Sequence, residues 1–370
     1  YYGNQAETLE GRSIPLGAGY FDFTTDEPYG VSAQIIPWNF PVEMTARSLS
    51  AALTTGNTVV VKPPEMTPLS NAWFAYAAEA VGLPEGAVNL VCGYGHEAGA
   101  ALSAHPDINQ VVFTGSVATG IAIASAAAKN VVPCVLELGG KSAAIVHSDA
   151  DLEAMETDIR KGIFINAGQV CSAMSRIIVH ESRHDELVQR AVSIAESLSV
   201  GPGLDRQTFG ANMGPMVSVK QRDRAAGLVS EAVSQGAKLA TGGRAMNIPG
   251  AFLQPTVLTE VTPEMTIAQT EVFGPVLSVL RFREDAEAIE IANGTDYGLV
   301  GGVFTRDLDR ATQVARKIRA GQVFVNEWFA GGVETPFGGY GKSGYGREKG
   351  REALWNYVQT KNIAIKLKRI

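Results

Sequence analysis

The sequence predicts an α/β protein with two α/β domains and a small β arm. Three observations predict this class. The chain has 370 residues, which is enough for two domains with separate hydrophobic cores. From residue 28 onward, short β-branched runs alternate with segments of helical periodicity. A glycine-rich turn also joins one such run to an alanine-rich helix, which is a strand–turn–helix unit typical of α/β domains.

Composition and charge exclude several classes of protein. The chain is 45% apolar and 19% charged, which is typical of globular domains, and its formal charge of −7 offers no basic surface to nucleic acid or an anionic membrane. No apolar run reaches the length of a membrane span. The histidines lack metal-ligand spacing. The three cysteines do not make a disulfide framework, so we expect a reducing, cytoplasmic environment.

The N-terminal region carries a hairpin signal. Short runs at residues 9–14 and 20–25 flank the sequence P-L-G-A-G, and a further strand is expected near the C-terminus at residues 362–367. A surface hairpin and an arm that packs on another subunit are both compatible with this pattern. We favour the arm, because an isolated two-stranded hairpin is only marginally stable.

The first α/β domain is predicted from an ordered series of segments. Strands are expected at residues 31–36, 58–61, 89–91 and 110–113, and helices after Pro41 and at residues 70–81 and 121–128. The helix at 70–81 carries an apolar stripe, which predicts that this stripe faces the core. The stripe consists of Trp73, Tyr76, Ala77 and Val81.

Two features of this domain are typical of dinucleotide binding. Lys62 and Glu65 follow a strand, and parallel strands bind dinucleotides at their carboxyl ends. A carboxylate can accept hydrogen bonds from both ribose hydroxyls and repels a 2′-phosphate, so Glu65 indicates NAD rather than NADP. The turn T-G-S-V-A-T-G at residues 114–120 opens a helix, as a pyrophosphate cradle does. Read alone, Glu65 also fits a solvated acid in a loop, and the segment at 114–120 also fits an ordinary turn.

A second α/β region follows residue 140. Strands are expected at residues 176–180, 276–280, 298–304 and 321–326, and helices at 151–162, 185–199, 220–235, 307–319 and 347–357. In the helix at 307–319 the inward residues are expected to be Leu308, Ala311, Val314, Ala315 and Ile318. The predicted domains are therefore an arm at 1–28, α/β domains at 29–139 and 140–346, and a C-terminal helix with the added arm strand at 347–370, in which residues 361–370 form the strand.

Candidate catalytic residues lie in three short motifs. Cys171 follows N-A-G-Q-V in a small polar loop, and a thiol becomes a potent nucleophile as the thiolate. Glu137, in L-E-L-G-G-K-S, can act as a base on the thiol or on water if both reach one pocket. Asn39 lies between two prolines in P-W-N-F-P, which can fix its amide as an oxyanion donor. Each residue also has a purely structural alternative. Cys171 could be a small buried hydrophobic residue, Glu137 a solvated residue at a strand end, and Asn39 a helix cap.

Together these motifs resemble the aldehyde dehydrogenase superfamily, non-acylating branch. Further matches are K-P-P-E at 62–65, F-T-G-S-x-x-x-G at 113–120, E-V-F-G-P at 271–275 and P-F-G-G at 336–339, so the resemblance covers nearly the whole chain. It implies a Rossmann-like cofactor domain, an α/β catalytic domain and an oligomerisation arm. It also implies oxidation of a small-molecule aldehyde to a carboxylic acid, in a homodimer or homotetramer. NAD is the implied hydride acceptor, with NADP as the weaker alternative.

The resemblance also implies roles for individual residues. Cys171 would be the nucleophile that forms a thiohemiacetal and then a thioester, Glu137 the general base for its hydrolysis, and Asn39 an oxyanion donor. The implied cofactor residues are Ile36, Pro37, Trp38, Lys62, Glu65, Gly95, Phe113, Gly115, Ser116, Leu138, Glu271 and Phe273. The implied substrate residues are Phe40, Arg47 and Phe337.

The helix after Pro41 departs from many relatives. Where they carry Trp and then Lys, this chain has Arg47 and Ser48, which questions some of the support for Glu137 or the cofactor. Arg47 can pair bidentately with a substrate carboxylate, which would indicate a semialdehyde with an anionic group. Alternatively, Arg47 pairs with a protein acid such as Glu43, four residues earlier in the helix.

Two other functions remain open from the sequence. In the CoA-acylating branch, CoA rather than water resolves the thioester, but those relatives usually lack the general-base glutamate that this chain has as Glu137. In the family, the segment that starts at Tyr1 follows a long N-terminal part of the cofactor domain. We therefore expect a fragment or part of a longer protein, and an inactive truncated relative is the second alternative.

Overall fold

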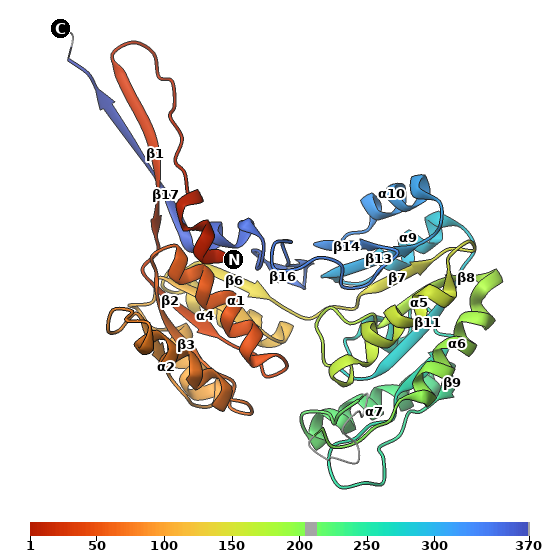
Figure 1. Cartoon of the computed structure of the whole chain (residues 1–370). Helices are drawn as coiled ribbons and strands as arrows, with labels where there is room; N and C mark the ends of the chain where they lie inside the picture. Colours follow the sequence, from red (N-terminus) through yellow and green to blue (C-terminus); the bar gives the residue numbers. More distant parts are fainter. Residues whose placement is uncertain (204–212, 369–370) are drawn as a thin grey trace. The chain divides into compact units, whose positions relative to one another are not determined.

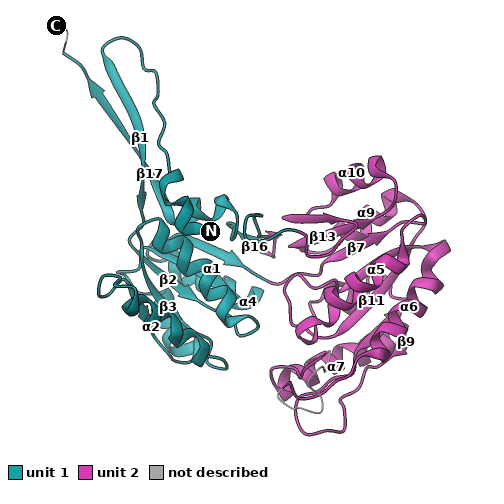
Figure 2. Ribbon diagram, viewed as in Figure 1, with its two compact units in different colours: residues 1–138, 331–338, 344–370 teal, residues 139–330, 339–343 magenta. Residues whose placement is uncertain are grey.

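The protein consists of two compact units (Figures 1 and 2). A computed structural model describes residues 1–203 and 213–368. Unit 1 comprises Tyr1–Leu138, Gly331–Gly338 and Gly344–Ile370, and unit 2 comprises Gly139–Ala330 and Gly339–Ser343. The first change of unit therefore falls one residue before the expected boundary after residue 139. Residues 331–338 and 344–346, which we expected in the second domain, lie in unit 1.

The sheet of unit 1 has the strand order β16-β6-β5-β2-β3-β4 within the described chain. All neighbouring pairs are parallel except β16 with β6. Because the chain adds β3 and β4 on one side of β2 and then β5 and β6 on the other, a topological switch point lies between β2 and β5. The strands of this sheet are β2 (Val31–Ile35), β3 (Thr58–Lys62), β4 (Val88–Leu90), β5 (Gln110–Thr114), β6 (Cys134–Glu137) and β16 (Gly344–Tyr345).

Both faces of this sheet are covered by helices, as the alternation of side chains along β5 shows. Val112 packs into a core with α1 and the C-terminal helix η7, whereas Val111 and Phe113 pack into a second core with α4. The sequence therefore correctly predicted a Rossmann-like arrangement. The helices of unit 1 are η1 (Tyr2–Thr8), α1 (Pro41–Thr54), η2 (Leu69–Asn71), α2 (Ala72–Ala80), η3 (Gly95–Gly99), α3 (Ala100–Ser103), α4 (Val117–Ala128) and η7 (Arg351–Tyr357).

The predicted inward face of α2 is wrong. Trp73 and Tyr76 are 73% and 64% exposed, and Val81 is 75% exposed. The half-buried positions of α2 include Phe74, Ala75 and Ala78 instead. The helix is apolar on nearly every side, so the stripe in the sequence could not select the packed face.

The predicted helix at 347–357 begins later than expected. Gly350 has a φ of 59°, in the left-handed region, and the helix η7 starts only at Arg351. Its residues Ala353, Leu354 and Tyr357 are buried in the core that α1 shares. Residues 347–349 therefore lie outside the helix: Glu348 pairs with Phe337 in an isolated bridge, and Lys349 has a φ of 58°.

The arm is a two-stranded antiparallel sheet of β1 (Tyr20–Pro28) and β17 (Val358–Lys366). The pairing runs from Tyr20 opposite Lys366 to Pro28 opposite Val358. Residues 9–14, which we expected to form the second hairpin strand, contribute only an isolated bridge between Ser13 and Phe23. The C-terminal strand is therefore the principal partner of β1, as the expected added strand required.

Unit 2 contains a sheet with the order β14-β13-β7-β8-β11-β10-β9 in the described residues, and only β9 is antiparallel to its neighbour. Strands such as β7 are buried at every residue, as expected for a parallel sheet covered on both faces. The strands are β7 (Ala143–Val146), β8 (Arg176–His180), β9 (Lys238–Thr241), β10 (Thr256–Thr259), β11 (Val276–Phe282), β13 (Val300–Phe304) and β14 (Gln322–Val325), and β12 (Tyr297–Gly298) pairs separately with β15 (Tyr340–Gly341).

The helices of unit 2 largely match the predicted ranges. In α10, Ala311 and Val314 are buried as predicted, but Leu308 is 76% exposed. It is the first residue of the helix, after the N-cap Asp307, and lies beyond the turn that packs on the sheet. The helices are α5 (Leu152–Ile159), η4 (Arg160–Phe164), η5 (Ile165–Gly168), η6 (Glu181–Arg183), α6 (His184–Ser197), α7 (Val219–Ser234), α8 (Thr266–Gln269), α9 (Asp285–Asn293) and α10 (Leu308–Lys317).

Candidate active site

Glu137 is a buried carboxyl group at the end of β6. It is 2% exposed, and neither of its carboxylate oxygens accepts a hydrogen bond from the described residues. A Cβ atom on Gly338 would lie 2.7 Å from its Oε1, so only glycine allows this close approach. Burial, and then the charge of Glu348, raise the pKa of Glu137 well above its ordinary value. A carboxyl group in this setting favours its protonated form and acts as a base once it has released the proton.

Arg47 points from α1 to protein acids. Its Nη2 lies 2.6 Å from Oε2 of Glu348, and its Nη1 lies 3.7 Å from Oε1 of Glu43. The guanidinium carbon lies 4.9 Å from the ring centroid of Phe337. The geometry therefore favours the second interpretation of Arg47, in which it pairs with protein acids, over a role in binding a substrate carboxylate.

Four predicted cofactor residues meet at the carboxyl end of β3. The Nζ of Lys62 donates to Oε2 of Glu65 over 2.7 Å. Partial burial opposes ionisation of Glu65, but the hydrogen bonds from Lys62 and from the Gly95 N–H outweigh it and lower the pKa of this carboxyl group. The Ile36 N–H donates to the Lys62 carbonyl, which ties the end of β2 to the same place. The fixed carboxylate of Glu65 is the acceptor that ribose hydroxyls require.

The glycine turn after β5 is closely packed. A Cβ on Gly115 would lie 2.4 Å from the ring of Phe113, and one on Gly120 would lie 2.7 Å from Leu138. Ser116 is the N-cap of α4 and accepts a hydrogen bond from the Thr119 N–H. The turn therefore brings the start of α4 close to the carboxyl end of the sheet, where N–H groups can bind an anion.

The segment of Pro37, Trp38, Asn39 and Phe40 connects β2 to α1 and is half-buried. The N-cap of α1 is Phe40, and Pro41 occupies the first helical turn. Asn39 is therefore not the N-cap residue that the structural alternative required. It follows β2 at the switch point of the sheet, where open α/β sheets bind ligands.

In unit 2, Cys171 follows a turn with unusual backbone conformations. Asn166, Ala167 and Gly168 have φ values of 50°, 53° and 69°. At Gly168 a Cβ would lie 2.1 Å from the Gly274 carbonyl oxygen, so only glycine fits. Cys171 itself is half-buried rather than sealed in apolar packing. Non-glycine residues in the left-handed region are strained and occur often at functional sites, where the surrounding structure holds them in place.

Gln169 holds this turn and was missed by the sequence analysis. Its side chain is buried; Oε1 accepts from the Val217 N–H over 2.8 Å, and Nε2 donates to the Asn166 carbonyl over 2.9 Å. These bonds connect the Cys171 loop to the start of α7. The motif G-Q-x-C could have indicated Gln169, but only if a buried amide side chain had been expected to support the loop that carries the thiol.

Glu271 and the Cys171 loop meet over two glycines. The Gly140 N–H donates to Oε1 of Glu271 over 3.1 Å, and a Cβ on Gly139 would lie 2.2 Å from its Oε2. A Cβ on Gly140 would lie 2.7 Å from the Cys171 carbonyl oxygen. Burial raises the pKa of Glu271 to about 7. Phe273, two residues later, has a φ of 54° and precedes the Gly274 carbonyl that packs on Gly168.

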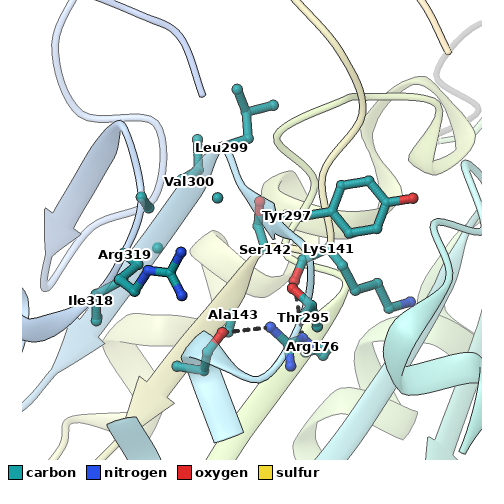
Figure 3. A pocket seen from close by; sticks show the side chains of 14 residues that line it. Lys141, Ser142, Ala143, Arg176, Thr295, Tyr297, Leu299, Val300, Ile318 and Arg319 are labelled. Carbon is teal, nitrogen blue, oxygen red and sulfur yellow. Dashed lines mark hydrogen bonds between the residues drawn. The ribbon is translucent and has the colours of Figure 1, made fainter. Parts of the chain in front are cut away.

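Arg176 fixes the backbone that follows these glycines. It is 1% exposed and donates to the carbonyls of Lys141, Ile291 and Ala292, each over 2.9 Å. Burial, together with the charge of Arg176, lowers the pKa of Lys141 to about 7. Figure 3 shows residues that line the adjacent cavity. Its volume of about 10 Å³ suits a single water molecule and is too small for a substrate.

We expect Arg176→Met to destabilise the protein by about 3–5 kcal/mol, because three backbone carbonyl groups would lose their donor, and two of these hydrogen bonds are fully buried. Urea denaturation monitored by circular dichroism measures this change. The matched control is Arg283→Met, since the Arg283 side chain is exposed and, among the described residues, forms an ion pair only with Glu181. An unchanged midpoint for Arg176→Met would contradict the structural role of this arginine.

Comparison with known proteins decides the family. A family model described as "Aldehyde dehydrogenase family" matches residues 1–363. The chain belongs to the aldehyde dehydrogenase family. It is 44% identical over 368 residues to the rat protein "Aldehyde dehydrogenase, cytosolic 1", covering 99% of this chain and 73% of the relative. It is 43% identical to human "Retinal dehydrogenase 2", covering 99% of this chain and 70% of the relative.

A solved structure supports the same conclusion. The "NAD+ complex structure of aldehyde dehydrogenase from Bacillus cereus" matches with a TM-score of 0.97 and 43% identity, covering 100% of this chain and 74% of the other. This aldehyde dehydrogenase is therefore an NAD(P)-dependent oxidoreductase that converts aldehydes into carboxylic acids, and the resemblance seen in the motifs is confirmed. Within the described residues, no helix is long and apolar enough to cross a membrane.

In this aldehyde dehydrogenase the predicted residues fall into two groups. Glu137, Asn39 and the Lys62–Glu65 pair belong to unit 1, whereas Cys171, Glu271 and Phe273 belong to unit 2. Sequence reasoning missed the buried acid Glu348 as well as Gln169 and Arg176. Glu348 follows a glycine-rich loop in G-R-E-K-G, and nothing local to that sequence distinguishes it from a solvated acid.

Proposed function

We propose that this chain oxidises an aldehyde with Cys171 as nucleophile, Glu137 as general base and Asn39 as oxyanion donor. One observation carries the proposal: Gly139 and Gly140 join the half-exposed Cys171 loop to Glu271, although these residues lie far apart in the sequence. A reactive thiol needs partial exposure and a fixed backbone. The loop supplies both.

Unit 1 is the cofactor domain and unit 2 the catalytic domain in this proposal. The residues of unit 1 fit NAD, because Glu65 is held as a carboxylate beside Lys62 and Gly95 at the carboxyl end of β3. The relative from Bacillus cereus is described in complex with NAD+. Bound NAD+ supplies the acceptor for the hydride. Glu65 would bind the adenosine ribose, the turn at Gly115 and Ser116 the pyrophosphate, and Glu271 the nicotinamide ribose.

The protein groups act in sequence on the substrate carbonyl. The Cys171 thiolate forms a bond to the aldehyde carbon, and the Asn39 amide donates a hydrogen bond to the oxygen as its negative charge develops. After oxidation the carbon is held as a thioester on Cys171. Glu137, once deprotonated, removes a proton from a water molecule while the water oxygen attacks the thioester carbon. The C–S bond then breaks to release the carboxylic acid.

An assay with a panel of aldehydes tests the proposed reaction. We expect NADH and the matching carboxylic acid to form without CoA, at a higher kcat/KM with NAD than with NADP, because Glu65 repels a 2′-phosphate. Absorbance of NADH and chromatography of the acid measure both products. Formation of an acyl-CoA only when CoA is present would instead support the acylating branch, and no turnover with any aldehyde would support an inactive relative.

The arm of β1 and β17 is proposed to join subunits in a homodimer or homotetramer. Its aromatic residues include Tyr20 and Phe21, which are 47% and 49% exposed, and a two-stranded sheet gains stability by packing on another surface. Light scattering after size-exclusion chromatography measures the assembly. The free cysteines and the relative named as cytosolic support a cytoplasmic location.

A further inference from the structure

Unit 1 buries two carboxyl groups next to one arginine. Glu137 and Glu348 are 2% and 4% exposed. The Arg47 side chain is 9% exposed and lies 2.6 Å from the Glu348 carboxylate, whereas Glu137 accepts no hydrogen bond from the described residues. Two buried acids with one paired cation cannot both carry a full negative charge without a large desolvation cost.

The fold places these three groups from separate elements. The pairing of β6 with β16 sets Gly344 opposite Glu137, and the chain then runs on to Glu348. Two backbone hydrogen bonds of 2.7 Å fix Glu348 against Phe337. The ring of Phe337 stacks beneath the Arg47 guanidinium, which therefore cannot turn away from Glu348 without losing both contacts. The arrangement is rigid enough to hold a charge in one place.

Other charged and titratable groups also face the pair. Arg347 acts on Glu137, while Glu43 and Lys349 act on Glu348. The phenols of Tyr2 and Tyr357 are buried near Glu348, and their pKa values are raised by burial and then by its negative charge. Among Arg47, Arg347 and Lys349, the ion pair recorded with Glu348 in the described part of the chain is that of Arg47.

The two carboxyl groups differ in how strongly they retain a proton. Burial raises the pKa of Glu348, but the adjacent Arg47 opposes this rise. Burial and the charge of Glu348 raise the pKa of Glu137 further, and Arg47 offsets only part of the rise. The order follows from geometry, because Glu348 has an ion-pair partner and Glu137 has none among the described residues.

We propose that Arg47 fixes the negative charge of this carboxyl pair on Glu348 and thereby keeps the exchangeable proton on Glu137 in the resting protein. Arg47 is then a positioning residue for that proton and does not bind the substrate. Glu137 must release the proton before it can activate water, so the ion pair sets the pH at which Glu137 becomes a base. The catalytic consequence rests on the proposed role of Glu137, whereas the distribution of charge does not.

A double-mutant cycle on the pH profile tests this proposal. In Glu348→Gln, Glu137 loses a neighbouring negative charge, so its ionised form is favoured and the acid limb of kcat is expected to move to lower pH by about one unit. In Arg47→Gln, Glu348 loses its partner and takes up a proton. Adding Glu348→Gln to that background should therefore leave the acid limb unchanged. Equal shifts in both backgrounds, or no shift in either, would overturn the proposal.

Two further variants keep the test decisive. Glu43→Gln is the matched control, because the exposed Glu43 lies near the same guanidinium, and its acid limb should match that of the wild type. If Arg47→Gln does not fold, the double variant replaces it, since a neutral pair is tolerated where a single buried charge is not. The acid limb of the Arg47→Gln/Glu348→Gln double variant should lie at higher pH than that of Glu348→Gln alone. Coincidence of these two limbs would contradict the proposal.

An infrared titration of the protonated carboxyl band separates the two levels of the argument. The band is assigned with Glu137→Gln and Glu348→Gln. The proposed charge distribution predicts two results. The resting band is lost in Glu137→Gln, and in Glu348→Gln the band remains but titrates at a lower pH. If this band moves as expected but the acid limb of kcat does not, the general-base role of Glu137 fails and the ion-pair proposal stands. A resting proton on Glu348 would refute the proposal directly.

Discussion

Replacement of Cys171 by alanine is expected to lower kcat for aldehyde oxidation by about 10⁴-fold or more, because the covalent route disappears. NAD binding should remain, since the proposed adenosine site around Lys62 and Glu65 belongs to unit 1 and Cys171 to unit 2. Steady-state NADH formation measures the first effect, and quenching of protein fluorescence by NAD measures the second.

The exposed Cys92 offers the matched control. It lies in unit 1 and is not one of the residues proposed for catalysis, so Cys92→Ala should oxidise aldehydes at the wild-type rate. Retained activity in Cys171→Ala would contradict the nucleophile assignment. Loss of both activity and NAD binding would instead indicate that the variant is misfolded, which circular dichroism and Cys171→Ser would reveal.

Glu137→Gln is expected to lower steady-state turnover by about 10²–10⁴-fold, because water would lack its base. The first turnover should still produce NADH, since formation of the thioester does not require this proton transfer from water. Stopped-flow absorbance should therefore show a burst of about one NADH per chain, followed by a slow phase. A steady-state rate equal to that of the wild type would contradict the general-base role, and Glu43→Gln is the control for loss of an acid in the same unit.

Local motifs predicted the parts of the site that are local in the chain. Lys62 and Glu65 are three residues apart and form an ion pair at the end of β3, where the sequence indicated a ribose acceptor. The turn at Gly115 and Ser116 opens α4 as expected. In these cases the strand, the turn and the functional side chain follow one another, so a short stretch of sequence contains the necessary information.

The remaining features depend on contacts between distant segments. Glu348 is buried beside Arg47 because β16 pairs with β6, and no local pattern indicates that pairing. The apolar stripe that predicts the packed face of an amphipathic helix also fails on α2, because the other residues of this helix are mostly alanine and leave no polar face to exclude from the core. The Arg47 alternatives could be ordered only once Glu348 was located.

Mass spectrometry of the trapped acyl-enzyme tests the central claim most directly. Glu137→Gln is mixed with an aldehyde and NAD, quenched in acid and digested. The account predicts one acyl group per chain on the peptide that contains Cys171, and its disappearance in the Glu137→Gln/Cys171→Ala double variant. An unmodified Cys171 peptide during the NADH burst, or an acyl group on Cys92 or Cys134 instead, would contradict it.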